Sequence, residues 1–126
     1  MGQSSVAVIR ISGPNSFNIA KKLTGTKKTR THHEIALLLI KNNEGVSLDR
    51  GLFTFFVSPN SYTGEDVVEI SCHGNQLVVG IIINRCIKLG ARIAEPGEYT
   101  KRAFLNDKIS LSQAESVGAL ISSKSE

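Results

Sequence analysis

The chain has 126 residues, of which 40% are hydrophobic and 21% are charged, so it suits one small folded domain rather than a disordered tail. Fifteen Lys and Arg against eleven Asp and Glu give a net charge of +4, which suits an anionic partner but is too weak to identify nucleic acid. The longest apolar stretch, residues 77–83, is far too short to cross a membrane, and residues 1–5 carry no secretory signal.

The predicted elements alternate between β-branched runs and stretches with helical spacing. In chain order they are a strand at residues 6–12, a helix that starts at Gly13-Pro14 and ends at Gly25, strands at residues 35–41, 48–58 and 65–72, a helix at residues 75–89, a short strand at residues 91–94, a short helix at residues 98–105 and a helix from residue 111. The turn residues 42–45 lie between two of these strands and predict a β-hairpin, whereas residues 27–33 are polar and basic and predict a surface loop.

The segment at residues 75–89 has the composition of a strand as well as that of a helix. Its length favours a helix, and its ends support this, because Asn75 suits an N-cap and Gly90 suits the position after a helix. The whole order of elements predicts an α+β domain with a mixed or mostly antiparallel sheet packed with helices.

The last helix has no Gly or Pro at its end, which indicates that it continues in a longer parent protein. Either Ser110 with Gln113 or Ser112 with Glu115 supplies a capping box for it. We therefore expect one domain at residues 1–109 and the start of a following helical domain at residues 110–126.

Several strong chemical motifs are absent from the sequence. It contains no phosphate-binding loop, no G-x-G-x-x-G, no C-x-x-C and no H-E-x-x-H. His32 and His33 are adjacent and His73 is remote, so we expect no metal site. Cys72 and Cys86 are too few for a disulfide framework and favour a reduced setting.

Two charged residues lie inside otherwise apolar strands. Arg10 is either an exposed or paired arginine, or a guanidinium that holds an anion or a planar ring. Glu69 lies between two aliphatic residues, so a half-buried carboxylate there needs hydrogen-bond donors. An aminopyrimidine ring edge could provide two such donors, and a salt bridge to Arg10 or Arg92 could equally satisfy it.

Three collinear segments together resemble one family: V-A-V-I-R-I-S-G-P (residues 6–14), S-Y-T-G-E-D-V-V-E-I-S-C-H-G (residues 61–74) and A-R-I-A-E-P-G-E-Y-T-K-R-A-F-L-N-D-K-I-S-L-S-Q-A-E-S-V (residues 91–117). They are similar to the N-terminal domain of the tRNA-modification GTPase family MnmE/TrmE. The resemblance implies a domain that binds a tetrahydrofolate derivative and forms a homodimer. It also implies a fold similar to a folate-binding domain of the glycine-cleavage aminomethyltransferase.

The resemblance also implies three cofactor-binding residues. The arginine of the family's I-R-I-S-G stretch falls on Arg10, the glutamate that closes T-G-E-D-V-x-E falls on Glu69, and the lysine of A-F-L-N-D-K falls on Lys108. Glu69 would bind the aminopyrimidine edge of the pterin, and the two cations would bind polar and acidic groups of the cofactor. Read as an isolated residue, Lys108 would be an ordinary solvated lysine.

The sequence departs from the family pattern in some places. Members usually begin with an additional strand ahead of the I-R-I-S-G stretch, and Asn75 replaces a common glycine. The GTPase domain and the C-terminal catalytic-cysteine motif are missing from the chain, so Cys72 and Cys86 do not take the role of that cysteine.

The expected function is that of a binding domain, with no catalytic residue of its own, in a cytoplasmic GTPase. The resemblance implies that the parent uses magnesium and potassium for GTP hydrolysis and acts on C5 of a wobble uridine in tRNA with the flavoprotein MnmG. The one-carbon donor would be 5-formyl- or 5,10-methylene-tetrahydrofolate.

Two alternatives remain open at this point. One is a standalone aminomethyltransferase-like enzyme with Asp66 as general acid or base. The other is an RNA-binding module, although a solvated basic face explains the same residues: Lys21, Lys22, Lys27, Lys28, Arg30, His32 and His33.

Overall fold

The structure, a computed structural model, describes residues 5–125, with side chains as far as Leu120. Its elements are β1 (Val6–Ser12), α1 (Ser16–Thr24), β2 (Ile35–Lys41), β3 (Ser47–Phe56), β4 (Val67–His73), α2 (Gln76–Lys88), α3 (Glu98–Leu105) and α4 (Leu111–Ser125). The parts of the two domain predictions that concern residues 1–4 and 126 lie outside the described residues.

The strands form one antiparallel sheet in the order β1-β4-β3-β2. The predicted hairpin is confirmed, because β2 and β3 pair directly. The α+β class is confirmed as well, and the sheet is fully antiparallel rather than mixed among the described residues. None of the helices described is long and apolar enough to cross a membrane.

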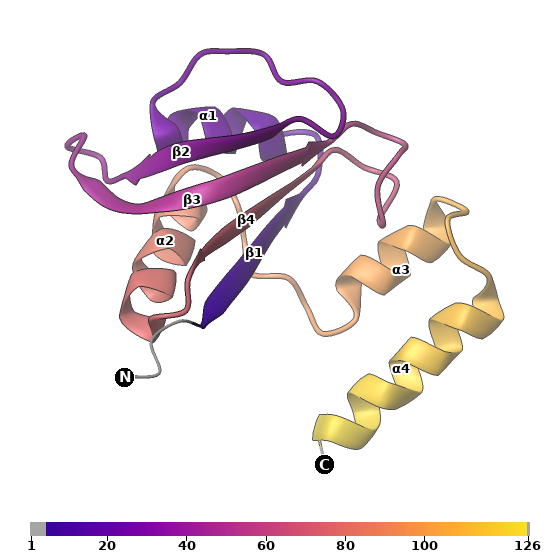
Figure 1. Cartoon of the computed structure of the whole chain (residues 1–126). Helices are drawn as coiled ribbons and strands as arrows, with labels where there is room; N and C mark the ends of the chain where they lie inside the picture. Colours follow the sequence, from indigo (N-terminus) through magenta and orange to yellow (C-terminus); the bar gives the residue numbers. More distant parts are fainter. Residues whose placement is uncertain (1–4, 126) are drawn as a thin grey trace.

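One face of the sheet carries the hydrophobic core. Figure 1 shows α1 and α2 on this same face. The largest fully buried apolar side chains come from both helices and three strands: Leu23, Ile40, Phe53, Val68, Ile70 and Ile82. Both cysteines lie in this core as free thiols, and burial raises the pKa of Cys86 to about 11, so this thiol is a poor nucleophile.

The ends of α2 follow the predicted signals. The side-chain oxygen of Asn75 accepts hydrogen bonds from the backbone N–H groups of Leu77 and Val78 at 2.9 and 3.2 Å. At the other end Gly90 has a φ of +119°, and the N–H of Ala91 reaches back to the carbonyl of Cys86.

The helix α4 begins with a capping box. Ser110 N–H donates to Oε1 of Gln113, and Gln113 N–H donates to the Ser110 hydroxyl oxygen, at 2.8 and 3.1 Å. The first of the two predicted pairs is therefore the one formed.

The predicted strand at residues 91–94 is wrong, because this segment is irregular. A strand there would need a ladder partner, and the neighbouring free edge belongs to β1. The outward carbonyl of Arg10 on that edge accepts a hydrogen bond from the Tyr99 hydroxyl at 2.8 Å instead. Two other strands differ from prediction at their ends: β3 stops at Phe56, and β4 begins at Val67.

The opposite face of the sheet, which we call the open face, is not covered by α1 or α2. It carries aliphatic side chains that are 43–67% exposed: Val6, Val8, Ile35, Leu37, Leu39 and Leu52. The helices α3 and α4 lie beside the sheet, beyond β1 (Figure 1). An antiparallel sheet with one solvated face usually places polar residues on it, so these aliphatic residues form an unusual apolar surface.

Candidate functional site

Arg10 and Glu69 form an ion pair across two neighbouring strands. The Nε of Arg10 lies 2.8 Å from Oε2 of Glu69, and the two residues are directly opposite in the register of β1 and β4. The side chains are 53% and 32% exposed, so the pair is accessible from the open face. Of the two partners considered for Glu69, Arg10 is the one that the structure supports.

The register explains why the two side chains meet. Gly13 N–H donates to the carbonyl of Asp66, and Gly74 N–H donates to the carbonyl of Ser5. The odd-numbered residues of β1 therefore form the hydrogen-bonded pairs with β4, which leaves Arg10 and Glu69 as a non-hydrogen-bonded pair. Side chains of such pairs lie closest together in an antiparallel ladder.

The ion pair leaves unused hydrogen-bonding groups. Among the described residues, Oε1 of Glu69 receives no hydrogen bond, and neither Nη of Arg10 donates one. One acceptor thus lies beside two donors. A flat molecule whose edge carries an N–H group next to a carbonyl would match this arrangement.

The pair lines a cavity of about 730 Å³, which we call the open-face cavity. Its other walls come from β3, β4, α3 and two loops: His33, Phe56, Asn60, Ser61, Tyr62, Thr63, Val67 and Tyr99. This volume lies within the range of about 300–1,000 Å³ that is usual for small-molecule sites.

Sequence reasoning missed the aromatic walls of this cavity. His33 has a positive φ of 63°, its ring stacks on His32 at 3.9 Å between ring centroids, and it meets the ring of Phe56 edge-on at 5.4 Å. Tyr62 and Tyr99 come from segments far apart in the chain: Tyr99 belongs to α3, and the Tyr62 hydroxyl lies 2.9 Å from that of Thr100 in the same helix. The adjacent histidines and the tyrosines were visible in the sequence, but their positions depend on long-range packing.

A polar network fixes the loop before β4. The Ser12 hydroxyl donates to Oε1 of Glu65 at 2.7 Å, and the hydroxyls of Ser12 and Thr63 lie 2.8 Å apart. Arg102 of α3 donates to both carboxylate oxygens of Glu65 at 2.8 and 3.1 Å. The loop, β1 and α3 are therefore joined at one carboxylate.

A second carboxylate, Glu98, secures α3 from its other side. Arg92 donates two parallel hydrogen bonds to Glu98 at 2.8 and 2.6 Å, and Arg102 donates to the same side chain at 2.6 and 3.0 Å. These bonds, led by that from Arg92, hold the pKa of Glu98 well below its usual value. The helix α3 is thus attached to the sheet mainly by polar contacts.

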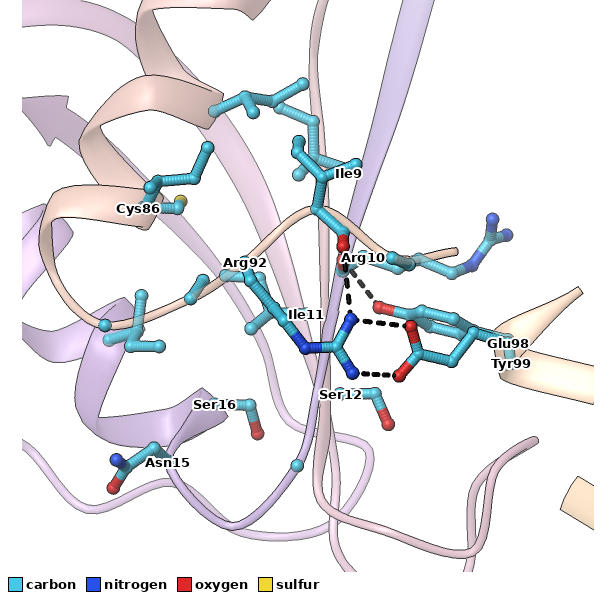
Figure 2. A pocket seen from close by; sticks show the side chains of 18 of the residues that line it. Ile9, Arg10, Ile11, Ser12, Asn15, Ser16, Cys86, Arg92, Glu98 and Tyr99 are labelled. Atoms are coloured by element: carbon cyan, nitrogen blue, oxygen red, sulfur yellow. Dashed lines mark hydrogen bonds and ion pairs between the residues drawn. The ribbon is translucent and has the colours of Figure 1, made fainter. Parts of the chain in front are cut away.

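Arg92, Glu98 and Tyr99 also line a second cavity of about 540 Å³ between β1 and α2. Figure 2 shows it from close by, with Arg92 and Glu98 face to face and the Tyr99 hydroxyl directed at the backbone of Arg10. Arg10 also lines this cavity, but its side chain points away from it (Figure 2). The second cavity therefore lacks the free ionic groups of the open-face cavity.

Lys108 does not line the open-face cavity. Its Cγ lies 3.3 Å from the position that a Cβ of Gly64 would occupy, so its stem packs against the loop at residues 61–64 that forms one wall. The backbone ending α3 sets this position: Asp107 has a φ of 59°, and Lys108 N–H donates to the carbonyl of Ala103 at 2.8 Å. The structure brings Arg10 and Glu69 together and leaves Lys108 behind this wall.

Asp66, the general acid or base of the enzyme alternative, accepts hydrogen bonds that hold neighbouring segments in place. Its carboxylate accepts a hydrogen bond from the N–H of Ser58 at 2.8 Å, and its carbonyl accepts from Ser16 and Gly13. It does not line the open-face cavity. This position gives no support to a catalytic role.

These features define a small α+β domain with a polar-edged, aromatic-walled cavity at one end of an open sheet face. The chain belongs to the family described as GTP-binding protein TrmE N-terminus, whose model matches residues 1–108. It is 50% identical over 125 residues to a tRNA modification GTPase MnmE of Neisseria meningitidis serogroup B, which covers 98% of the chain and 27% of that relative.

Other relatives with the same name come from Laribacter hongkongensis, at 46% identity over 99% of the chain, and Chromobacterium violaceum, at 47% over 99%. The chain covers 28% of the length of each of these two proteins. It thus spans about a quarter of the relatives it matches, and the resemblance in its sequence to the N-terminal domain of this family is confirmed.

We expect Gly64→Ala to loosen the contact between the loop at residues 61–64 and the end of α3. Gly64 has a φ of +84°, and a Cβ there would lie 2.8 Å from Cβ of Asn106, whose amide donates to the carbonyl of Thr63. The strain of a left-handed residue alone costs about 1–3 kcal/mol. Gly45→Ala is the matched control, because Gly45 has a similar φ of +80° with no atom within 4 Å. Urea unfolding should show a larger decrease in the free energy of unfolding for Gly64→Ala than for Gly45→Ala. Equal decreases would contradict the steric role.

We expect Glu98→Gln to destabilise the domain in a pH-dependent way. Because the pKa of Glu98 is lowered on folding, its ion pairs contribute fully above its ordinary value of 4.5, and this contribution is lost as the pH falls through the lowered pKa. Thermal unfolding should therefore show a difference between wild type and Glu98→Gln that is largest near pH 7 and shrinks in acid. The exposed Glu115→Gln on α4 should show little difference at any pH, and a pH-independent effect of Glu98→Gln would refute the explanation.

Proposed function

We propose that this domain binds a tetrahydrofolate derivative in the open-face cavity. The observation that carries the proposal is the Arg10–Glu69 pair, which leaves one carboxylate oxygen and two guanidinium nitrogens unused beside a cavity of about 730 Å³. Membership of the TrmE N-terminal family supports the same choice of residues.

The edge of a pterin fits these groups chemically. Its 2-amino-4-oxopyrimidine part carries an amino group and a ring N–H next to a carbonyl oxygen. Glu69 would accept from the N–H groups, and Arg10 would donate to the carbonyl. The second nitrogen-containing ring would then lie among the aromatic walls, where flat rings gain packing area.

Lys108 has a different position in the proposed complex. Its stem lies behind the loop at residues 61–64, so its ammonium group would meet acidic or polar groups of the cofactor that extend beyond the cavity. When bound, the cofactor would supply a one-carbon unit, as either a 5-formyl or a 5,10-methylene form. The domain itself would bind and orient it.

We also infer that the domain forms a homodimer through the open face. The aliphatic side chains of this face are exposed in the single chain, and such a patch is costly to leave in water. The cavity lies at the end of the same face, so a second copy could cover it and restrict access to solvent. A symmetric dimer through one self-complementary patch is the commonest oligomer.

In the longer parent protein, the domain would serve a cytoplasmic GTPase that modifies C5 of a wobble uridine in tRNA with the flavoprotein MnmG. The names of the relatives support a role in tRNA modification. Magnesium and potassium would belong to the GTPase part, which this chain does not contain. The aminomethyltransferase alternative gains no support from the position of Asp66.

We expect Glu69→Gln and Arg10→Gln each to weaken binding of 5-formyltetrahydrofolate by about ten- to a hundredfold. Each change removes one charge-assisted hydrogen bond, worth roughly 1.5–3 kcal/mol. Isothermal titration calorimetry measures this directly on the 126-residue chain. Glu44→Gln, in the exposed turn between β2 and β3, is the matched control and should bind like wild type. A folded wild-type protein that gives no heat at high micromolar ligand, or variants that bind normally, would refute the site.

We expect Leu37→Glu to disrupt the dimer. Leu37 lies on the open face and is 60% exposed, so a charge there would be buried without a partner in the proposed interface. Sedimentation velocity should show a dimer for wild type and a monomer for the variant. Leu77→Glu on α2, whose residue is 73% exposed away from this face, should remain dimeric. A monomeric wild type at high micromolar concentration would overturn the proposal.

A further inference from the structure

The positive charge of the chain is concentrated in one region. Residues 15–41 hold six Lys and Arg and one Glu, which gives this region a charge of +5, whereas the rest of the chain carries −1. The basic residues are Lys21, Lys22, Lys27, Lys28, Arg30 and Lys41. The net charge of +4 is therefore a local property of this region.

The structure separates these cations into two groups. Arg30 pairs with Glu34 at 2.8 Å, its side chain is 7% exposed, and it lies over the ring of Phe55, so it is a structural residue. Lys28 also approaches Glu34, at 3.6 Å. Both are thereby partly neutralised.

The other four cations form no ion pair among the described residues: Lys21, Lys22, Lys27 and Lys41. We call them the lysine cluster. Elsewhere in the described chain, Arg10, Arg92 and Arg102 are each paired with carboxylates, whereas five other cations form no ion pair: Arg50, Arg85, Lys88, Lys101 and Lys108. The sequence alone does not show which cations are neutralised. It also does not show that Lys41, from a separate strand, lies near the others.

The cluster comes together where α1 ends. Lys21 and Lys22 lie in the last turn of α1, and Lys27 follows two residues after the loop begins at Gly25. The ammonium nitrogen of Lys41, at the end of β2, lies 3.7 Å from the position that a Cβ of Gly25 would occupy. Figure 1 shows this end of α1 and β2 at the side of the sheet remote from α3 and α4.

The helix dipole accounts for part of the cluster only. Cations in the last turn of a helix interact favourably with its negative end, which suits Lys21 and Lys22. Lys27 and Lys41 lie outside the helix and have no such reason. Unpaired like charges close together repel one another, so a nearby polyanion would relieve this repulsion.

We propose that the lysine cluster is a contact site for the phosphate backbone of RNA, specifically of tRNA. The lysines are point charges on flexible stems, and no aromatic residue is among them, so they suit sequence-independent contacts with phosphates rather than stacking on bases. The choice of tRNA rests on the proposed role in tRNA modification. None of the four lysines lines the open-face cavity, so the cluster leaves the proposed cofactor contacts free.

The test is fluorescence anisotropy of a labelled tRNA transcript titrated with the 126-residue chain over a series of KCl concentrations. Wild type should bind, and the logarithm of the association constant should fall linearly with the logarithm of the salt concentration. Lys22→Gln/Lys27→Gln should bind more weakly and reduce the slope by about 1.5, since each lost phosphate contact contributes roughly 0.7–0.9.

The matched control is Lys88→Gln/Lys101→Gln, which removes the same charge from α2 and α3. Its slope should equal that of wild type. No tRNA binding at low salt, an unchanged slope for Lys22→Gln/Lys27→Gln, or an equal change for both double variants would overturn the proposal. Poly-glutamate that displaces tRNA at equal charge concentration would overturn it in favour of an acidic protein partner.

The cofactor experiment separates this proposal from the proposed function. Lys22→Gln/Lys27→Gln should bind 5-formyltetrahydrofolate as wild type does, which also shows that the variant is folded. A wild-type protein that binds tRNA through the cluster but gives no heat with the folate would refute the cofactor site alone.

Discussion

The guanidinium of Arg102 lies between two carboxylates and connects α3 to the loop that precedes β4. It donates to Glu65 in the loop before β4 and to Glu98 at the start of its own helix. Because α3 contributes few apolar side chains to the core, these bonds and the Tyr99 hydroxyl are its main links to the sheet. Buried or half-buried charges are costly unless paired, so the network specifies one position for α3. The cavity walls that α3 supplies depend on that position.

The two faces of the sheet differ in what covers them. On one face of the sheet, helices cover a conventional core, and the stability of the fold comes mainly from that burial. The other face has the Arg10–Glu69 pair, the aromatic cavity and the exposed aliphatic residues. In the proposed complex, a ligand and a partner subunit would meet on this one surface. The lysine cluster does not line the cavity.

Local signals predicted most of the fold but only part of the site. Asn75 and Gly90 marked the ends of α2 because capping depends on a few adjacent residues. Arg10 and Glu69 were noticeable because charges interrupt apolar strands. The resemblance to the family selected these two residues and also Lys108, which does not line the open-face cavity. The walls supplied by His33 and Tyr99 were missed because they are brought to the cavity by packing between distant segments. The segment at residues 91–94 has the composition of a strand, and its lack of a ladder partner is a tertiary property.

The register between β1 and β4 determines both the packing of the core and the pairing of Arg10 with Glu69. Side chains alternate along a strand, so a shift of one residue would turn the Arg10 guanidinium inward among the aliphatic core and bring Ile11 to the outside. An unpaired guanidinium among hydrocarbon groups is strongly disfavoured, so misaligned strands are rejected as they form. Burial of the core therefore selects the one register that places Arg10 and Glu69 opposite each other on the open face. Every correctly folded molecule carries this ion pair at the same position.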